Sequence, residues 1–165
     1  MGERNIQKLE TCPVYDKFQI AFRKEGEEVF TPIESGLSGG EQALALISVA
    51  MIPKSMPLVI DQPEDELGPS LITNELVEQI RNVKDKRQLI FVTHIANIPV
   101  LGDSEQIAYI KQRIDDGKKY SVVECSGSLD DIQIIEKLLE LDGGEKAFQK
   151  RNERYLPFIS KKQNG

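Results

Sequence analysis

Two short apolar runs, separated by a helical stretch, set the expected fold of this chain. The first run spans residues 58–60 and the second spans residues 89–92. Continuous runs of this kind are typical of parallel strands that are covered on both faces. Residues 70–84 lie between them and are apolar at helical spacing, at Ile72, Leu76, Ile80 and Val83. The order strand, helix, strand predicts a right-handed crossover between parallel neighbours.

Another helix is expected over residues 39–52, the most apolar helical stretch in the sequence. It is apolar nearly all round, which favours burial over a surface position. Pro53 follows directly and ends it. Earlier in the chain, aromatic and aliphatic residues alternate with other residues over residues 18–22, which predicts a half-buried strand. Residues 28–30 return that strand as a hairpin.

The second half of the chain predicts one hairpin and two helices. Residues 106–110 and 120–124 are expected to be strands, joined by a turn at residues 115–117 and placed at the edge of the sheet. Helices are expected over residues 129–141 and 145–154, with two glycines between them as C-cap and breaker. The sequence therefore predicts an α/β fold with a largely parallel sheet, flanking helices and an edge hairpin.

The composition indicates one soluble, acidic domain. The chain has 165 residues, of which 39% are hydrophobic, and this is enough for a proper core. We expect an irregular lead-in over residues 1–16, one lobe over residues 17–155 and a polar, frayed tail over residues 156–165. The formal net charge of −6 gives no electrostatic argument for nucleic-acid binding by this piece.

Cysteines, hydropathy and charge exclude further classes of function. Cys12 and Cys125 show no metal-ligand or redox spacing and fit a reducing cytosol, so a cytoplasmic location is expected. No apolar run approaches membrane-spanning length, so we expect no membrane partner. The basic residues are scattered and are expected to form ordinary solvated surface. They include Lys84, Lys86, Arg87, Lys118, Lys119, Lys150, Arg151 and Arg154.

Residues 37–42 read Leu-Ser-Gly-Gly-Glu-Gln and open the apolar helix. Ser38 is a good N-cap, and Glu41 lies three residues on, where its side chain can reach back to the amide of the cap. Gly39 and Gly40 leave the first helical turn bare, so its N–H groups and the positive end of the helix dipole are open to phosphate oxygens. Taken alone, the pattern also fits an ordinary helix start.

Polar residues follow both predicted strands. Asp61 and Gln62 come after the first, and Thr93 and His94 come after the second. Ligands of open α/β sheets lie beyond the carboxyl ends of the strands, so these side chains are expected at one site. An aspartate in this position can hold Mg²⁺, usually through water, beside nucleotide phosphates. Taken singly, Asp61 also fits a turn residue and His94 a structural histidine.

Three of these features together resemble the motifs of ABC-type ATPases. Residues 37–42 match the signature motif at every position, residues 58–61 are similar to a Walker B strand, and His94 is similar to the switch histidine. Their order along residues 17–124 resembles the C-terminal lobe of an ABC-type head of the SMC, RecF and RecN kind. Residues 61–65 and 86–94 resemble in particular bacterial SMC-like ATPases linked to DNA repair or phage defence.

The resemblance implies a P-loop NTPase-like fold and an ATP-dependent dimer of heads. In that family, the signature of one head contacts the γ-phosphate that the other head holds, here through Ser38, Gly39 and Gly40. Glu41 and Gln42 would support the signature loop. Further roles carried over are Mg²⁺ binding by Asp61 and hydrogen bonds from His94 to the γ-phosphate and the attacking water. The implied partners are a second head, a Walker A lobe and, for the full-length protein, DNA.

The chain departs from the family pattern at three places. No Gly-x-x-x-x-Gly-Lys-[Ser/Thr] loop occurs, so the chain is expected to be a fragment or one half of a split head, inactive alone and an ATPase only with a Walker A lobe. Gln62 replaces the usual glutamate base, and an amide accepts no proton at neutral pH. Glu64 or Asp65 takes that role, or is only a solvated loop carboxylate. Gly68 replaces the aspartate that usually ends the D-loop.

Three functions remain open on the sequence alone. The first is half of an ATP-hydrolysing head that drives DNA processing or repair. The second is a non-hydrolysing, ATP-gated dimerisation module, which Gln62 favours. The third is an unrelated α/β binding domain whose motifs match by chance, and a sheet with Asp61 and His94 at opposite edges would favour it.

Overall fold

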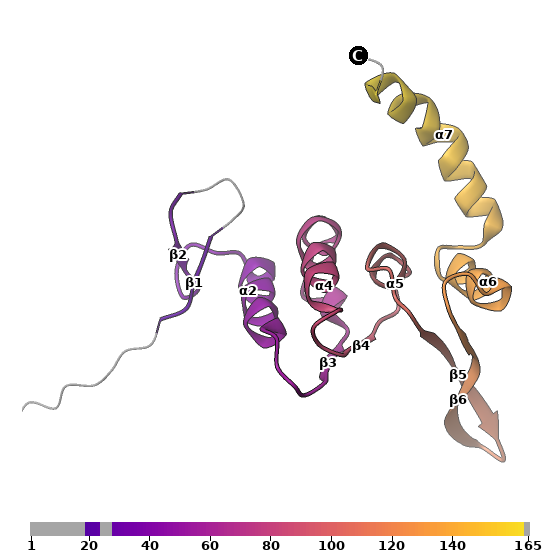
Figure 1. Cartoon of the computed structure of the whole chain (residues 1–165). Helices are drawn as coiled ribbons and strands as arrows, with labels where there is room; N and C mark the ends of the chain where they lie inside the picture. The colour runs from indigo at the N-terminus through magenta and orange to yellow at the C-terminus, as the bar shows by residue number, and fades with distance from the viewer. Residues whose placement is uncertain (1–18, 24–27, 164–165) are drawn as a thin grey trace, which may run out of the picture. The chain divides into compact units, whose positions relative to one another are not determined.

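The computed structural model describes residues 19–23 and 28–163 of the chain as a mixed α/β structure. The chain divides into two compact units, Met1–Ser38 and Gly39–Gly165. Figure 1 follows the elements from the indigo β1–β2 pair to the yellow helix α7. Across the described residues the strands form three two-stranded sheets, of which one is parallel and two are antiparallel. A parallel pair of strands is therefore present as expected, but the expected larger, mostly parallel sheet does not form among the described residues.

The first unit contains a short antiparallel pair. Strand β1 (Ala21–Phe22) pairs with β2 (Thr31–Pro32), and the Ile33 amide donates a hydrogen bond of 2.9 Å to the Ile20 carbonyl. The predicted hairpin is confirmed, but its return strand is β2 and not residues 28–30. Val29 and Phe30 are exposed, so no burial holds them in the ladder. The predicted turn and Phe18 lie outside the described residues.

The parallel crossover was predicted correctly. Strand β3 (Leu58–Asp61) pairs in parallel with β4 (Leu89–Val92), in register from Leu58 opposite Leu89 to Asp61 opposite Val92. A continuous helical segment connects the two strands and contains α3 (Pro69–Leu71), the π-helical turn η2 (Ile72–Leu76) and α4 (Val77–Val83). Its predicted apolar face is buried at Ile72, Leu76 and Ile80.

Helix α2 (Gly39–Met51) begins and ends within one residue of the prediction. It is buried along only one face, at Leu44, Ala45 and Met51, so the expectation of burial all round was wrong. Leu46 and Val49 on α2 are both exposed.

One face of the β3–β4 pair is also open. Side chains alternate between the two faces of a strand, and here Val59 is 61% exposed, Ile90 43% and Val92 48%. The prediction that both strands are covered on both faces was therefore wrong. Within residues 28–163, the β3–β4 pair has no third strand.

A long hairpin forms a sheet of its own. Strands β5 (Ile107–Asp115) and β6 (Lys118–Gly127) are antiparallel and longer than predicted. The tight turn consists of Asp116 and Gly117, whose φ angles of 45° and 74° are those of a two-residue hairpin turn. Among the described strands, the hairpin pairs with neither β3 nor β4, so its predicted place at the edge of the main sheet was wrong.

Three helices complete the chain. The sequence did not predict α5 (Asn97–Leu101), which precedes the hairpin, but it did predict α6 (Ile132–Leu141) and α7 (Glu145–Gln163). Helix α7 runs past Pro157, so the expected frayed tail from residue 156 was wrong as far as residue 163. None of the described helices is both long enough and apolar enough to cross a membrane.

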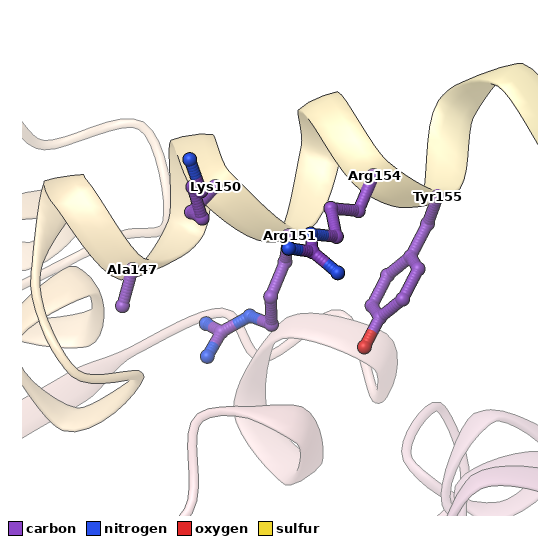
Figure 2. A pocket seen from close by; sticks show the side chains of 5 residues that line it. All are labelled: Ala147, Lys150, Arg151, Arg154 and Tyr155. Atoms are coloured by element: carbon purple, nitrogen blue, oxygen red, sulfur yellow. The ribbon is translucent and has the colours of Figure 1, made fainter.

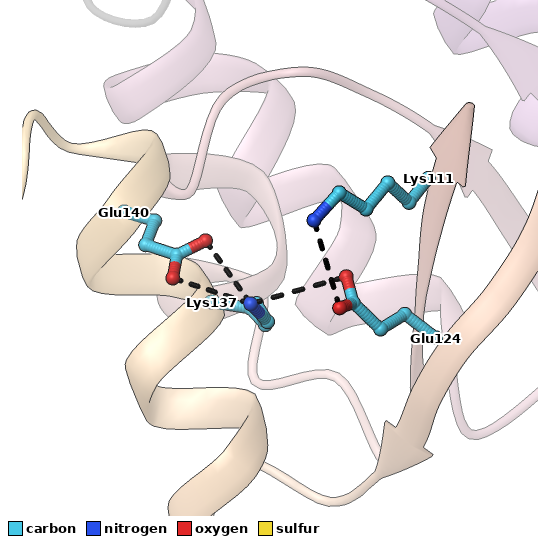
Figure 3. Close-up of polar contacts among 4 residues, drawn as sticks. All are labelled: Lys111, Glu124, Lys137 and Glu140. Carbon is cyan, nitrogen blue, oxygen red and sulfur yellow. Dashed lines mark hydrogen bonds and ion pairs between the residues drawn. The ribbon is translucent and has the colours of Figure 1, made fainter. Parts of the chain in front are cut away.

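The core near the hairpin packs α6 against β5 and β6. Ala96, Ile134 and Leu138 are buried there, with Ile107 and Cys125 packed against them. At the surface of the same region, Lys137 lies between Glu140 and Glu124, with nitrogen–oxygen distances of 3.2 and 3.9 Å (Figure 3). Lys111 also lies 3.7 Å from Glu124. Charge pairs of this kind at the surface contribute little stability each, so the apolar core holds α6 in place.

Arg87 is the one basic residue named above that the structure shows to be buried, so its predicted solvated position was wrong. Its Nη1 donates to the Ala50 and Ile52 carbonyls at 2.5 and 3.1 Å, and its Nε donates to the Met56 carbonyl at 2.8 Å. A cation is favourable at the C-terminal end of a helix dipole. Arg87 therefore ties the end of α2 to the segment that leads into β3.

Candidate functional site

The carboxyl ends of β3 and β4 lie side by side. Asp61 pairs with Val92, and the Gln62 amide donates a hydrogen bond of 2.8 Å to the Val92 carbonyl. The two strands therefore end together, and Asp61 and Thr93 both lie at this edge of the sheet. This confirms that the two strands deliver their polar residues to one edge, and it contradicts the arrangement expected of a chance match.

The chain turns sharply after Asp61. Gln62 is exposed and has left-handed backbone angles, with φ at 44° and ψ at 57°. A 3-10 turn, η1 (Pro63–Asp65), follows directly, with Pro63 buried. Because the turn folds back towards β4, it brings the side chain of Glu64 to Thr93 and His94.

Glu64 is the centre of the site. Its side chain is only 5% exposed, so it is not a solvated loop carboxylate. Its Oε1 accepts hydrogen bonds from the Thr93 hydroxyl at 2.6 Å and from the His94 amide at 2.7 Å. The Nδ1 of the His94 ring lies 2.9 Å from the same oxygen. The sequence named Glu64 and His94 separately but gave no sign that they touch.

Hydrogen bonding keeps Glu64 ionised. Burial by itself raises the pKa of a carboxyl, but the hydrogen bonds from Thr93 and from the His94 amide, with the charge of His94, outweigh it and lower the pKa of Glu64. Its other oxygen, Oε2, is buried and accepts no hydrogen bond from the described residues. Glu64 is thus a buried carboxylate. One of its oxygens accepts several hydrogen bonds, and the other is buried without a hydrogen-bond partner among the described residues.

His94 contacts Glu64 but extends towards solvent. Its side chain is 58% exposed, although its Nδ1 is held by Glu64. Thr93 stiffens the turn further, because its hydroxyl oxygen accepts a hydrogen bond of 3.2 Å from the Ile95 amide. Because more than half of its side chain is exposed, His94 is the residue of this cluster that a ligand can reach most easily.

The glycines of the signature differ from one another. A Cβ added to Gly40 would lie 3.2 Å from the Glu66 carbonyl and 3.1 Å from Leu71, so the chain's own loop approaches this glycine closely. A Cβ added to Gly39 would meet nothing within 4 Å. Ser38 and Gly39 are exposed. The roles of Glu41 and Gln42 stay predictions.

A magnesium ion would find one protein ligand here. No group of three or more histidine, cysteine, aspartate or glutamate side chains comes together in the part of the chain that the structure describes. Mg²⁺ usually keeps several waters and takes one or two carboxylates plus substrate phosphates. The exposed Asp61 at the strand end fits that arrangement.

A shallow pocket lies elsewhere, on α7. Five residues of α7 line it, namely Ala147, Lys150, Arg151, Arg154 and Tyr155 (Figure 2). Arg151 also donates a hydrogen bond of 2.8 Å to the Asp142 carbonyl. None of the residues predicted to bind nucleotide or metal lines this pocket.

Replacing Glu64 with glutamine is expected to lower the free energy of unfolding at neutral pH, by an amount that shrinks in acid. The folded pKa of Glu64 lies below the ordinary value of 4.5, so the stability contributed by the carboxylate is complete above that value. It is lost as the pH falls through the folded pKa. Urea denaturation of both proteins at about pH 7 and about pH 3 measures the change. A difference that does not depend on pH contradicts it.

Comparisons with known proteins find similar solved structures at low identity, and two of them are described below. No protein-family model and no curated protein matches the chain. One similar structure, from "Structural biochemistry of ATP-driven dimerization and DNA stimulated activation of SMC ATPases", has a TM-score of 0.47 and 21% identity, covering 74% of this chain and 72% of its own. The other, "Crystal structure of the SmcHead bound to the C-winged helix domain of ScpA", has a TM-score of 0.44 and 22% identity, covering 62% of this chain and 30% of its own. Both TM-scores lie below 0.5, so neither likeness supports a function.

Proposed function

We propose that this chain is half of an ATP-hydrolysing head of the ABC type and that it turns over ATP only with a Walker A lobe. One observation supports the proposal most. The parallel pairing of β3 and β4 puts Asp61 at the same edge as the Glu64–His94 pair. These residues belong to motifs that resemble Walker B and the switch histidine, in the order of that family.

The open face of the β3–β4 pair supports a missing lobe. Parallel strands are normally covered on both faces, whereas Val59, Ile90 and Val92 are exposed. A pair of strands is also a marginal sheet by itself. A Walker A lobe that extends this pair with further strands and packs helices on its exposed face would bury these side chains, and it would supply the phosphate cradle that the chain lacks.

Each site residue then has a role. Asp61 holds Mg²⁺ beside the phosphates, and His94 faces the γ-phosphate and the attacking water. Ser38, Gly39 and Gly40 contact the nucleotide held by a second head, so two copies close around ATP. Glu41 and Gln42 support the signature loop from within α2. The exposed tip at Gly39 leaves room for that second molecule.

The full-length protein is proposed to couple this ATP cycle to work on DNA. The support is the resemblance of residues 61–65 and 86–94 to bacterial SMC-like ATPases of DNA repair or phage defence. We test it by adding double-stranded DNA to the full-length protein. A rise in ATP turnover supports the coupling, and unchanged turnover with no DNA binding contradicts it.

Reconstitution with a Walker A lobe tests the ATPase. We expect ATP turnover from the mixture and none from this chain alone. Asp61→Asn should reduce turnover by about 100-fold or more, because the metal at the phosphates loses its carboxylate. Asp130→Asn, at an exposed aspartate outside the site, should leave turnover unchanged. Turnover that is insensitive to Asp61 contradicts the proposal.

A non-hydrolysing, ATP-gated dimer is the second candidate. Gln62 favours it, because this exposed residue stands where the family carries the glutamate base. This candidate predicts a long-lived ATP complex and no turnover in the mixture, and faster turnover for Gln62→Glu. Rapid turnover of the unmodified chain excludes it.

A further inference from the structure

We propose that helix α7 of one copy of this chain docks on helix α6 of a second copy, in a reciprocal contact that needs no nucleotide. Each copy then gives one α7 and receives one, as a twofold dimer requires. The contact goes beyond the proposed ATPase, because it uses no residue of the ATP site. The two helices support it by their opposite charge, their exposed apolar side chains, the pocket on α7 and the linker between them.

The two helices lie in segments of opposite charge. Residues 128–145, which contain α6, hold six aspartates and glutamates and one lysine. Residues 146–163, which make up the rest of α7, hold six lysines and arginines and one glutamate. Lys150, Arg154 and Glu136 are exposed and form no ion pair within the part of the chain that the structure describes. Two copies can therefore pair these segments with opposite charges facing each other.

Each helix also exposes apolar side chains on one face. On α6, Ile132 is 75% exposed, and Ile135 one turn further on is exposed as well. On α7, Tyr155 is 59% exposed, and Ile159 one turn further on is exposed too. Exposed apolar surface that is bordered by charged residues is typical of a protein interface.

The chain's own α7 does not cover α6. Helices joined by a three-residue loop, as here, commonly fold back on one another as an antiparallel pair. Such a pair would bring Tyr155 beside Ile132, because the two residues lie nearly equally far from Gly143. Both side chains are exposed instead, so this pair is open. The α7 of a second copy can take the vacant place, as in a domain-swapped dimer.

The linker sets the direction in which α7 leaves α6. Gly143 and Gly144 have φ angles of 92° and 86°, in the left-handed region that favours glycine. The Gly144 amide donates a hydrogen bond of 2.7 Å to the Leu139 carbonyl. Arg151 Nη2 donates one of 2.8 Å to the Asp142 carbonyl. These contacts hold the start of α7 in the open direction, so less conformational entropy is lost when a second copy binds.

The pocket on α7 fits an acidic side chain of that second copy. All of its lining residues belong to α7, and three of them are the cations Lys150, Arg151 and Arg154 (Figure 2). Tyr155 adds an aromatic ring to the lining. A carboxylate of α6, such as that of Glu136, can enter between the cations while its isoleucine neighbours pack on the ring. Arginine suits this role because its guanidinium binds carboxylates in a planar fork.

Sedimentation of the full chain alone, without nucleotide, tests the contact. We expect a dimer whose dissociation constant rises by about 10-fold or more between about 50 mM and about 500 mM salt, because salt screens the charges. Tyr155→Ser should also raise it by about 10-fold or more, because an apolar anchor is lost. A chain that stays monomeric at about 200 μM in low salt overturns the proposal.

A charge exchange shows which helices meet. Arg154→Glu and Glu136→Lys should each raise the dissociation constant by about 10-fold or more, because like charges then face each other. An equimolar mixture of the two variants should restore the dimer, since each altered helix then meets its complement. Glu78→Lys, at an exposed acid on α4, is the matched control and should change nothing. A mixture that associates no better than either variant overturns the pairing of α6 with α7.

Duplex DNA is the competing partner for the same cations. A monomeric chain that binds DNA, and loses this binding in Arg154→Glu, overturns the dimer contact. The apolar faces favour the dimer, since phosphates would leave Ile132 and Ile135 uncovered. All these measurements omit ATP and the Walker A lobe. The dimer contact can therefore fail while the proposed ATPase stands, and the reconstituted head can fail to turn over ATP while the dimer stands.

Discussion

Replacing Arg87 with methionine is expected to lower the free energy of unfolding by about 2–4 kcal/mol, because three carbonyls near the end of α2 lose their donor. Methionine keeps the length of the side chain and fills the buried space, so the loss reports the hydrogen bonds to Ala50, Ile52 and Met56. Urea denaturation followed by circular dichroism measures the change. It is the largest stability effect that we expect from a single polar side chain here.

Two matched variants control for this result. Lys86→Met removes an exposed neighbouring cation and should change the free energy of unfolding by less than about 0.5 kcal/mol. Arg87→Lys keeps the charge but loses the planar fork, so its loss should be smaller than that of Arg87→Met. Equal stabilities of Lys86→Met and Arg87→Met contradict the buried contacts.

Gly39→Asp is expected to lower ATP turnover in the reconstituted head by about 100-fold or more, without lowering the free energy of unfolding. A side chain at residue 39 meets nothing within 4 Å, and an aspartate in the first turn of α2 favours the helix dipole by about 0.3–1 kcal/mol. The same carboxylate repels a triphosphate presented by a second head. Turnover and urea denaturation of one variant thus respond in opposite directions.

The neighbouring glycine is the matched control. Gly40→Ala should destabilise the chain, because its Cβ would lie 3.2 Å from the Glu66 carbonyl. Gly39→Ala should keep the stability of the unmodified chain and lose less turnover than Gly39→Asp. A Gly39→Asp head with normal turnover contradicts a role for the tip in nucleotide binding.

Local patterns along the chain predicted elements well. The apolar run over residues 58–60 forms β3, and the stripe on the crossover helix lies on η2 and α4. The Asp-Gly pair forms the turn between β5 and β6. These features depend on neighbours within a few residues, and the sequence states those directly. The common edge of β3 and β4 also follows, because a helical crossover makes the strands parallel.

Features that depend on distant contacts could not be predicted. Glu64 is separated from His94 by thirty positions, and only the fold shows that η1 brings them together. Arg87 read as a surface cation, because nothing nearby in sequence marks the α2 carbonyls as its partners. The sequence predicted more burial than Val59 and Ile90 have. An apolar run indicates that a strand is covered, but it does not indicate whether the covering residues belong to the same chain.

Hydrogen exchange at the signature tip tests the central claim most directly. We would follow the amides of Gly39 and Gly40 in this chain alone, with the Walker A lobe, and with the lobe and ATP together. The account predicts slower exchange at both amides only in the third sample, where a triphosphate on the second head meets the bare helix turn. Exchange that is unchanged by ATP, in a mixture that has assembled, contradicts it.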